Sequence, residues 1–452
     1  MSTKAKTTSR DLTEGNIAKQ VLLFSLPLML GNVFQMLYNT VDSIVVGNFV
    51  GTQALAAVGS TTMIVNLFVF FFNGFSIGAS VVVGNLFGSR NMKKLHDAIE
   101  TVLTSSFILC VIFTIISVLG VRPMLRFMST PEDVFPEAVT YLRIYFAGIS
   151  GLLIYNIGSG ILRSVGDTTR PLYFLILTSV LNIILDLVFV IVFRLGIAGV
   201  ALATIIAQFI SAALILLLLT GTQDVYRFTW SDMKVDFDIL KRVFAVGLPA
   251  AVQQVITAFS NIFVQSYINY FGSGVMAGWS CYNKIDMFIM LPMQSMAMAA
   301  TTFVSQNIGA GKLKRADEGT RTTIILTEVI TFVVACLIWL FAAPALHLFT
   351  QDEAVIQFGV TFLRTNVFFL MFNCVNHVLA GAMRGSGDSK GPMVIMLTGF
   401  VAIRQIYLYI MAHFISNTPA AIGFGYPVGW MMTFVMMVSY FFWKRRKQNA
   451  NA

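Results

Sequence analysis

Four polar side chains in the first half of the sequence have the types and spacing needed to bind a cation inside an apolar environment. Asp42 lies near the end of one apolar run, and Asn182 and Asp186 lie inside another. Asn182 and Asp186 are four residues apart, so a helix places them on one face. Thr204 adds a hydroxyl from the next apolar run. Carboxylate, amide and hydroxyl oxygens suit a hard cation, and a buried carboxylate can instead carry a proton.

The apolar surroundings of these groups decide between two readings. A carboxylate in the hydrocarbon core of a membrane is costly, so it usually faces a cavity and acts on ions, protons or ligands. The alternative is that all four groups only form hydrogen bonds between helices. We expect a hard cation or a proton at these groups, no other metal and no cofactor. We expect no catalytic residues. The sequence also lacks the Gly-x-x-x-x-Gly-Lys-Ser/Thr phosphate loop, so direct drive by ATP is not expected.

The elements that position these groups follow from the composition. Of the 452 residues, 57% are hydrophobic and only 11% are charged, whereas soluble domains contain about 25% charged residues. Apolar runs of about 20 residues, each long enough to cross a bilayer as a helix, recur along the whole chain. The expected spans are residues 17–42, 54–80, 98–119, 138–161, 171–193, 197–220, 241–270, 276–300, 321–345, 358–382, 392–415 and 422–443.

The distribution of charge predicts the topology. Most of the 30 Lys and Arg fall on alternate connections and on both ends of the chain, whereas the opposite connections hold only Arg122, Arg126 and Arg194. By the positive-inside rule the basic side is cytoplasmic. Both termini are then cytoplasmic and the number of spans is even. This asymmetry accounts for the net charge of +9 without a nucleic-acid partner.

The chain contains an internal repeat. The loop from Arg163 to Pro171 matches the loop from Arg384 to Pro392 in its Arg, Gly, Asp and Pro, and the four matches share one constant offset along the chain. In each loop the Asp, at 167 or 388, is expected to cap the next helix rather than to take part in chemistry. Six spans separate equivalent points, so the repeats are parallel. Such two-fold transporters commonly bind substrate where the halves meet.

We therefore expect an all-α polytopic membrane protein of twelve transmembrane helices in two parallel six-helix repeats. The expected division is a cytoplasmic N-terminal tail (1–16), an N-lobe (17–220), a cytoplasmic linker (221–240), a C-lobe (241–443) and a cytoplasmic C-terminal tail (444–452).

The second half lacks the acidic set of the first. Val264 stands at the position equivalent to Asp42, and Arg404 and Tyr407 lie near the equivalent of Asp186. Ion coupling is therefore assigned to the first half. Polar and soft side chains suited to organic substrates give a candidate substrate cavity: Asn39, Asn156, Gln254, Asn261, Asn283, Asp286, Met290 and His377. For His377 and the methionines, ordinary packing is the alternative.

The order and spacing of several motifs resemble the multidrug and toxic compound extrusion (MATE) family over residues 17–445. The motifs are Leu26-Pro27, the run Tyr38-Asn-Thr-Val-Asp42, Gly84-Asn-Leu-Phe-Gly88, Asn182-x-x-x-Asp186, Gly199-x-Ala-x-Ala203-Thr204 and Gln306-Asn-Ile-Gly-Ala310. The resemblance implies two six-helix lobes in a V around a central cavity. It also implies a cation site at Asp42, Asn182, Asp186 and Thr204, and a bending first helix with Pro27 as its hinge.

The expected function is secondary active antiport. The resemblance implies export of cationic or amphipathic organic compounds, including xenobiotics, in exchange for Na⁺ or H⁺. The expected protein is a monomer in the inner membrane of a bacterium, with small organic substrates and the lipid bilayer as its partners. The alternatives are a metabolite exporter, a flippase of lipid-linked saccharides, and a membrane enzyme or passive channel.

Overall fold

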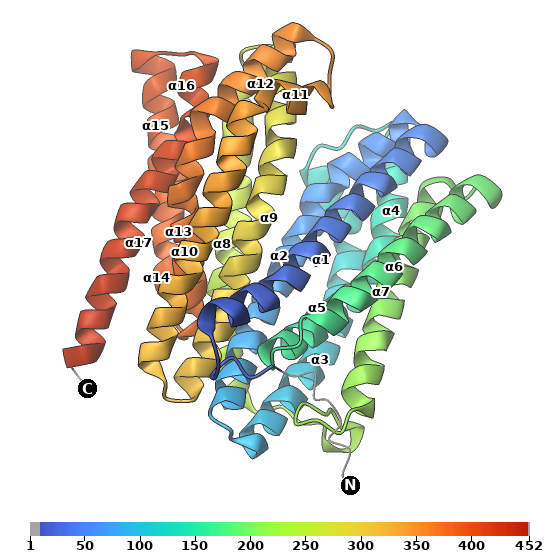
Figure 1. The fold of residues 1–452 in the computed structure, drawn as a ribbon. Helices are drawn as coiled ribbons and strands as arrows, with labels where there is room; N and C mark the ends of the chain where they lie inside the picture. Colours follow the sequence, from blue (N-terminus) through green and yellow to red (C-terminus); the bar gives the residue numbers. More distant parts are fainter. Residues whose placement is uncertain (1–9, 451–452) are drawn as a thin grey trace. The chain divides into compact units, whose positions relative to one another are not determined.

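The computed structural model describes residues 10–450, and all of the regular elements in that range are helices (Figure 1). Residues 1–9 and 451–452, which belong to the expected terminal tails and include Lys4 and Lys6, lie outside the described residues. The helices of the first half are α1 (Ile17–Val45), η1 (Val46–Val50), α2 (Thr52–Gly88), α3 (Met92–Phe127), α4 (Phe135–Ala147), α5 (Ile149–Ser164), α6 (Thr169–Leu187), η2 (Val188–Val192) and α7 (Gly196–Gly221).

The second half begins after a short 3-10 turn, η3 (Trp230–Asp232). Its helices are α8 (Phe237–Asn269), α9 (Ser273–Gly309), α10 (Leu313–Leu340), α11 (Ala342–His347), α12 (Glu353–Asn366), η4 (Val367–Phe369), α13 (Leu370–Gly385), α14 (Lys390–Leu397), η5 (Thr398–Ile403), α15 (Arg404–Ile410), η6 (Met411–Ile415), α16 (Pro419–Gly423) and α17 (Gly425–Ala450).

Within the described residues, eleven helical spans are long and apolar enough to cross a membrane, and a twelfth forms if the bent pair α4–α5 counts as one. This confirms the expected all-α membrane fold. The helices extend beyond the apolar runs: α3 covers Met92–Phe127, whereas its run covers residues 98–119. The difference arises because hydropathy marks only the lipid-facing stretch, while backbone hydrogen bonding continues into polar ends.

The fourth span is not one straight helix. It breaks at Gly148, and α4 and α5 meet at an angle of 45°. A Cβ atom at position 148 would overlap the side chain of Ile205 in α7, so only glycine permits this close approach. The sequence predicted a single span over residues 138–161 and gave no sign of the bend.

The chain forms two compact units, and two helices are divided between them. One unit contains the described residues up to Asp11 together with Leu26–Leu248; the other contains Leu12–Ser25 and all that follows from Pro249. The divisions fall one residue before Pro27 in α1 and directly before Pro249 in α8. Each proline lacks a backbone donor and weakens the helical ladder at that point.

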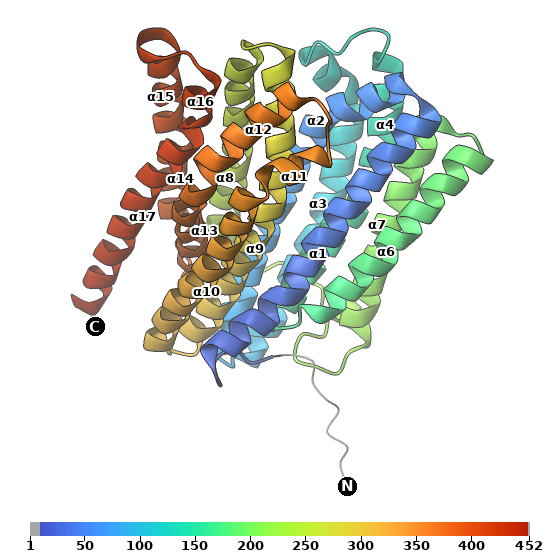
Figure 2. The same cartoon turned by 45° about the horizontal axis from the view of Figure 1, so that its top comes forward.

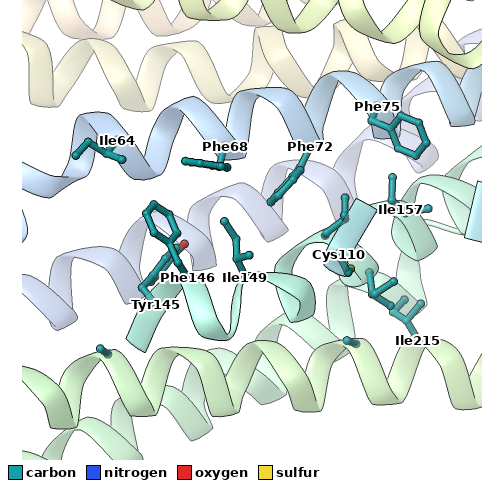
Figure 3. Packing of buried hydrophobic residues seen from close by; sticks show 14 of the residues in the cluster. Ile64, Phe68, Phe72, Phe75, Cys110, Tyr145, Phe146, Ile149, Ile157 and Ile215 are labelled. Carbon is teal, nitrogen blue, oxygen red and sulfur yellow. The ribbon is translucent and has the colours of Figure 1, made fainter. Parts of the chain in front are cut away.

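The core of the first unit is built on one face of α2. Ile64, Phe68, Phe72 and Phe75 follow each other at intervals of three or four residues on α2 and belong to one buried cluster with residues of α4 and α5 (Figure 3). The ring centroids of Phe68 and Phe146 are 4.8 Å apart. Because lipid tails are as apolar as these side chains, the helices associate by close packing rather than by the hydrophobic effect.

The two units repeat one helix contact at the same offset as the matched loops. In the first unit Ser80 Oγ on α2 donates to the Gly160 carbonyl on α5 at 3.0 Å. In the second unit Thr301 Oγ1 on α9 donates to the Gly381 carbonyl on α13 at 2.9 Å. A hydroxyl that pairs with a glycine carbonyl draws two helix backbones together, so the duplicated sequence has retained the same packing unit.

The segment before each half is held by polar contacts. In the second unit, Leu12 N donates to Gln306 Oε1 at 3.0 Å, and Lys312 Nζ donates to the Thr13 carbonyl at 2.9 Å. In the first unit, the fully buried Glu100 accepts a hydrogen bond from Thr229 N at 2.8 Å. These contacts hold the segments that precede α1 and α8 and so fix where each of the two helices begins.

The matched loops act as the sequence predicted. Asp167 Oδ1 accepts from Thr169 N and Arg170 N, both at 3.1 Å, and so caps α6. Asp388 Oδ1 accepts from Gly391 N at 3.0 Å, while its Oδ2 accepts from Tyr440 and Lys444. Burial opposes ionisation of Asp388, but these hydrogen bonds outweigh it and hold its pKa below the ordinary value.

We expect Asp388→Asn to lower the thermal stability of the detergent-purified protein at pH 7. The contribution of a carboxyl with a depressed folded pKa is present above its unfolded pKa of about 3.9 and is lost as the pH falls through the folded pKa. Loss of its charge-assisted hydrogen bonds is expected to cost about 1–2 kcal/mol, less than for a fully buried pair because Lys444 is partly exposed. Thermal melting of this variant beside Glu318→Gln, which removes an exposed acid, is the measurement. Equal melting temperatures for wild type and Asp388→Asn would contradict the structural role.

Candidate cation site

The site forms on the face that α6 turns toward α7. Asn182 and Asp186 are buried one helical turn apart, and the side chain of Asp186 has no exposed surface. Figures 1 and 2 both show α6 and α7 running side by side. Thr204 is buried on α7, and its hydroxyl donates to the Val200 carbonyl at 3.0 Å. The oxygen of Thr204 keeps lone pairs that can accept a proton or contact a cation.

Asp42 reaches the same region from α1. Its carboxyl lies close enough to that of Asp186 for a direct interaction. Two tyrosines on successive turns of α4, Tyr141 and Tyr145, lie within reach of the Asp42 charge, as does Tyr38 one turn before Asp42 in α1. The structure therefore brings the two predicted acids together inside one unit.

Several polar atoms of this site have no hydrogen-bond partner among the described residues. They are Asp42 Oδ1, both carboxylate oxygens of Asp186 and both amide atoms of Asn182. Buried polar groups are nearly always satisfied, so each exception needs an explanation. A Na⁺ ion or an added proton would give these oxygens the partner that the described residues do not supply.

The three tyrosines were missed by the sequence reasoning. Tyr38 precedes Asp42 by four residues and Tyr141 precedes Tyr145 by four, which is the spacing of neighbours on a helix face. That spacing was available in the sequence. Nothing in the sequence, however, indicated that Tyr141 lies within reach of the charges of Asp42 and Asp186.

The candidate substrate residues fall in both units. In the first unit Asn39 is exposed on α1, and Asn156 Nδ2 donates to the Leu152 carbonyl at 2.8 Å. In the second unit Gln254 Nε2 donates to the Ala250 carbonyl at 3.3 Å. Asn156 and Gln254 therefore already have backbone partners within their own helices, which is typical of structural side chains.

The remaining candidates lie on α8, α9 and α13 of the second unit. Asn261 is exposed, and the half-buried Asp286 lies near the phenol groups of Tyr282 and Tyr426. Met290 Sδ accepts from Asn373 Nδ2 at 3.5 Å. Asn283 is half-buried, and the His377 ring lies 6.5 Å from that of Phe400.

The position equivalent to the cation site has a different chemistry in the second unit. Val264 is buried where Asp42 lies in the first unit. Arg404, with only 3% of its surface exposed, donates to Ser260 Oγ at 2.8 Å and to Asn261 Oδ1 at 2.9 Å. Ser260 was not singled out from the sequence, because a lone serine in an apolar run carries no distinguishing pattern.

Comparison with known proteins identifies the family. The sequence model of the MatE family matches this chain twice, over residues 27–188 and 249–410. The chain belongs to the MatE family. The two matches are equal in length, which confirms the internal repeat and the resemblance to MATE transporters.

Relatives of this MatE protein are similar over almost their whole length. The chain is 30% identical over 415 residues to the probable multidrug resistance protein YpnP of Bacillus subtilis, covering 92% of this chain and 93% of the relative. It is 27% identical over 442 residues to the probable multidrug resistance protein YoeA of the same organism, covering 96% and 95%. A solved structure described as the outward-facing conformation of a multidrug resistance MATE family transporter matches with a TM-score of 0.90 at 26% identity, covering 99% of each chain.

Proposed function

We propose that this MatE protein is a secondary active antiporter that exports cationic or amphipathic organic compounds in exchange for Na⁺ or H⁺. The observation that carries the proposal is the pair of carboxyl groups of Asp42 and Asp186 inside membrane-spanning helices, in which Asp42 Oδ1 and both oxygens of Asp186 lack donors among the described residues. The names of the Bacillus subtilis relatives as probable multidrug resistance proteins support the substrate class. A chain with this role needs no cofactor and performs no enzymatic reaction.

The paired carboxyl groups explain how an ion can drive transport. Two carboxylates this close repel each other strongly when both are ionised, and a low-dielectric environment strengthens the repulsion. A Na⁺ ion held by Asp42, Asp186, Asn182 and Thr204, or a proton on one carboxyl, removes it. Binding of the ion therefore favours an arrangement of α1 and α6 in which the carboxyl groups are close, and its release favours a separated one.

Coupling requires that the ion and the organic substrate prefer different arrangements of the same unit. A ligand shifts a conformational equilibrium only by its difference in affinity for the two states. Pro27 directly follows Leu26, the first residue of α1 that belongs to the first unit. Its missing backbone donor makes this point of α1 a hinge at which the arm bearing Asp42 can change direction.

The proposal places the protein in the inner membrane of a bacterium as a monomer with both termini in the cytoplasm. Residues 17–220 act as the N-lobe, which couples to the ion, and residues 241–443 act as the C-lobe. The basic connections support this orientation, because Lys and Arg are enriched on the cytoplasmic side of membrane proteins.

Efflux from proteoliposomes tests the proposal. Vesicles containing the purified protein are loaded with the fluorescent cation rhodamine 6G, and Na⁺ and H⁺ gradients are imposed separately. We expect efflux to follow one of the two gradients and to stay at the rate of protein-free vesicles in the absence of both. No acceleration under either gradient, with folded protein confirmed, would contradict antiport and favour a lipid-linked saccharide as substrate.

A further inference from the structure

Arg404 places a permanent positive charge inside the second unit without a counter-ion. It lies in the apolar span Lys390–Ile415 and is almost fully buried. Among residues 10–450, no carboxylate oxygen lies within 4.0 Å of its guanidinium group. Its contacts are neutral oxygens and the ring of Tyr426, which lies 4.7 Å away. A guanidinium group does not lose its proton in proteins, so this charge persists inside the membrane.

The repeat places Arg404 at the position that Asn182 occupies in the cation site. The loops before α6 and α14 match at one constant offset, but the π-helical turn η5 inserts one residue before Arg404. The offset after η5 is therefore longer by that residue, which pairs Arg404 with Asn182. The two family matches, over residues 27–188 and 249–410, end at positions that differ by this longer offset. Burial supports this register: Leu408, the equivalent of the buried Asp186, is also fully buried. In the second unit the guanidinium group of Arg404 therefore supplies a fixed positive charge, whereas the equivalent position of the first unit has oxygens that can bind a mobile cation.

The contacts of Arg404 orient the exposed amide of Asn261. Asn261 Oδ1 accepts from Arg404 at 2.9 Å and from Tyr426 Oη at 3.4 Å. An amide oxygen that receives two donors must point toward them, so the two Nδ2 hydrogens point away. No acceptor for Nδ2 lies within hydrogen-bond distance in the described part of the chain. Asn261 therefore presents a donor group on an exposed surface, directly in front of a buried positive charge.

Ser260 and Gln405 hold this arrangement rigid. Ser260 Oγ accepts from Arg404 at 2.8 Å and from Gln405 Nε2 at 2.9 Å. Gln405 Nε2 also contacts the Ser260 carbonyl at 3.0 Å. Asp286, an acid whose charge acts on Tyr426, forms no ion pair with Arg404. The positive potential at Asn261 is thus balanced by no bonded carboxylate among the described residues.

We infer that Asn261 binds an anionic oxygen group of the transported compound, a carboxylate in the simplest case, and that Arg404 is the residue that positions and polarises it. This inference rests on the proposed function as an exporter and narrows its substrate class. Compounds that carry both a basic and an acidic group gain an interaction that a purely cationic compound lacks. The acidic group meets the donor at Asn261, where backing by a guanidinium group makes the hydrogen bond charge-assisted and stronger.

A matched pair of dyes isolates this contact. Rhodamine B has a free carboxylate, and its ethyl ester differs only in that this group is blocked. Equilibrium binding of each dye to the detergent-purified protein, measured by fluorescence polarisation without any ion gradient, gives a ratio of dissociation constants. We expect Arg404→Gln to weaken binding of the acid relative to the ester by about tenfold or more, which corresponds to one charge-assisted hydrogen bond.

Three further variants make the result specific. Arg404→Lys keeps the charge and is expected to restore part of the ratio, whereas Arg364→Gln removes a cation elsewhere in the same unit and leaves the ratio unchanged. Asn261→Leu alters an exposed side chain and is expected to give the same change as Arg404→Gln, even if the latter fails to fold. The inference is overturned if the ratio of the two dissociation constants is the same in Arg404→Gln and Asn261→Leu as in the wild type. It is also overturned if the wild type does not bind rhodamine B. Because the ratio is measured without a gradient, failure of ion-driven efflux would contradict antiport and leave the ratio intact.

Discussion

The substitution Asp186→Asn is expected to abolish ion-driven efflux of rhodamine 6G and to leave the protein inserted and folded. Asparagine has the same shape as aspartate, so the packing of α6 on α7 is retained. It cannot be ionised, so it neither carries a proton nor neutralises Na⁺. No N–H or O–H group among the described residues donates to Asp186, so the interaction that changes is the one with the Asp42 carboxyl group. Efflux under the driving gradient is expected to fall to the rate of protein-free vesicles.

The same loss is expected for Asp42→Asn, because its carboxyl group interacts directly with that of Asp186. Asp133→Asn serves as the matched control, since it removes an exposed acid in the connection before α4. Its efflux should equal that of the wild type. If Asp186→Asn were to retain gradient-dependent efflux at the wild-type rate, the carboxyl pair would be a structural feature and the coupling ion would bind elsewhere.

One substitution, glycine to alanine, is expected to have opposite effects at two helical positions. A Cβ atom on Gly381 in α13 would overlap the Ala297 carbonyl of α9 and lie 3.1 Å from Thr301 Oγ1. Overpacking of this kind is expected to cost about 1–3 kcal/mol. A Cβ atom on Gly59 in α2 meets nothing within 4 Å. There alanine should stabilise the helix by about 0.5–1 kcal/mol through its higher helix propensity.

Thermal melting of the purified variants distinguishes the two outcomes. Gly381→Ala is expected to lower the melting temperature and Gly59→Ala to raise it. A Gly381→Ala protein as stable as the wild type would show that α9 and α13 do not approach as closely as the hydrogen bond from Thr301 to the Gly381 carbonyl requires.

Hydropathy and the repeat were sufficient to predict the membrane class, the two halves and the approximate position of each span. These features follow from the length of apolar runs and from the matching loops at Arg163 and Arg384. The helix ends and the bend at Gly148 could not be predicted in the same way. Helix ends depend on local backbone hydrogen bonds, and the bend depends on Ile205, which lies on α7 and is distant from Gly148 in the sequence.

The members of the candidate cation site could be proposed from the sequence, whereas the side chains that surround them could not. A carboxylate within an apolar run is conspicuous, and the spacing of Asn182 and Asp186 puts both on one face. Tyr141 and Tyr145 are amphipathic side chains that fit a lipid interface, a core or a site equally well. Only the folded structure, in which both tyrosines lie within reach of the Asp42 charge, assigns them to the surroundings of Asp42. The same holds for Tyr426, whose contact with Arg404 joins α17 to α15 after a register change at η5.

The most direct test of ion coupling at the carboxyl pair is to let the organic cation drive the ion. Proteoliposomes with equal Na⁺ and H⁺ concentrations on both sides receive a gradient of rhodamine 6G alone, and the internal pH and Na⁺ are recorded with fluorescent indicators. The account predicts that one ion moves against the direction of the dye in the wild type and that none moves in Asp186→Asn. Movement of the dye through the wild-type protein without movement of either ion would contradict it.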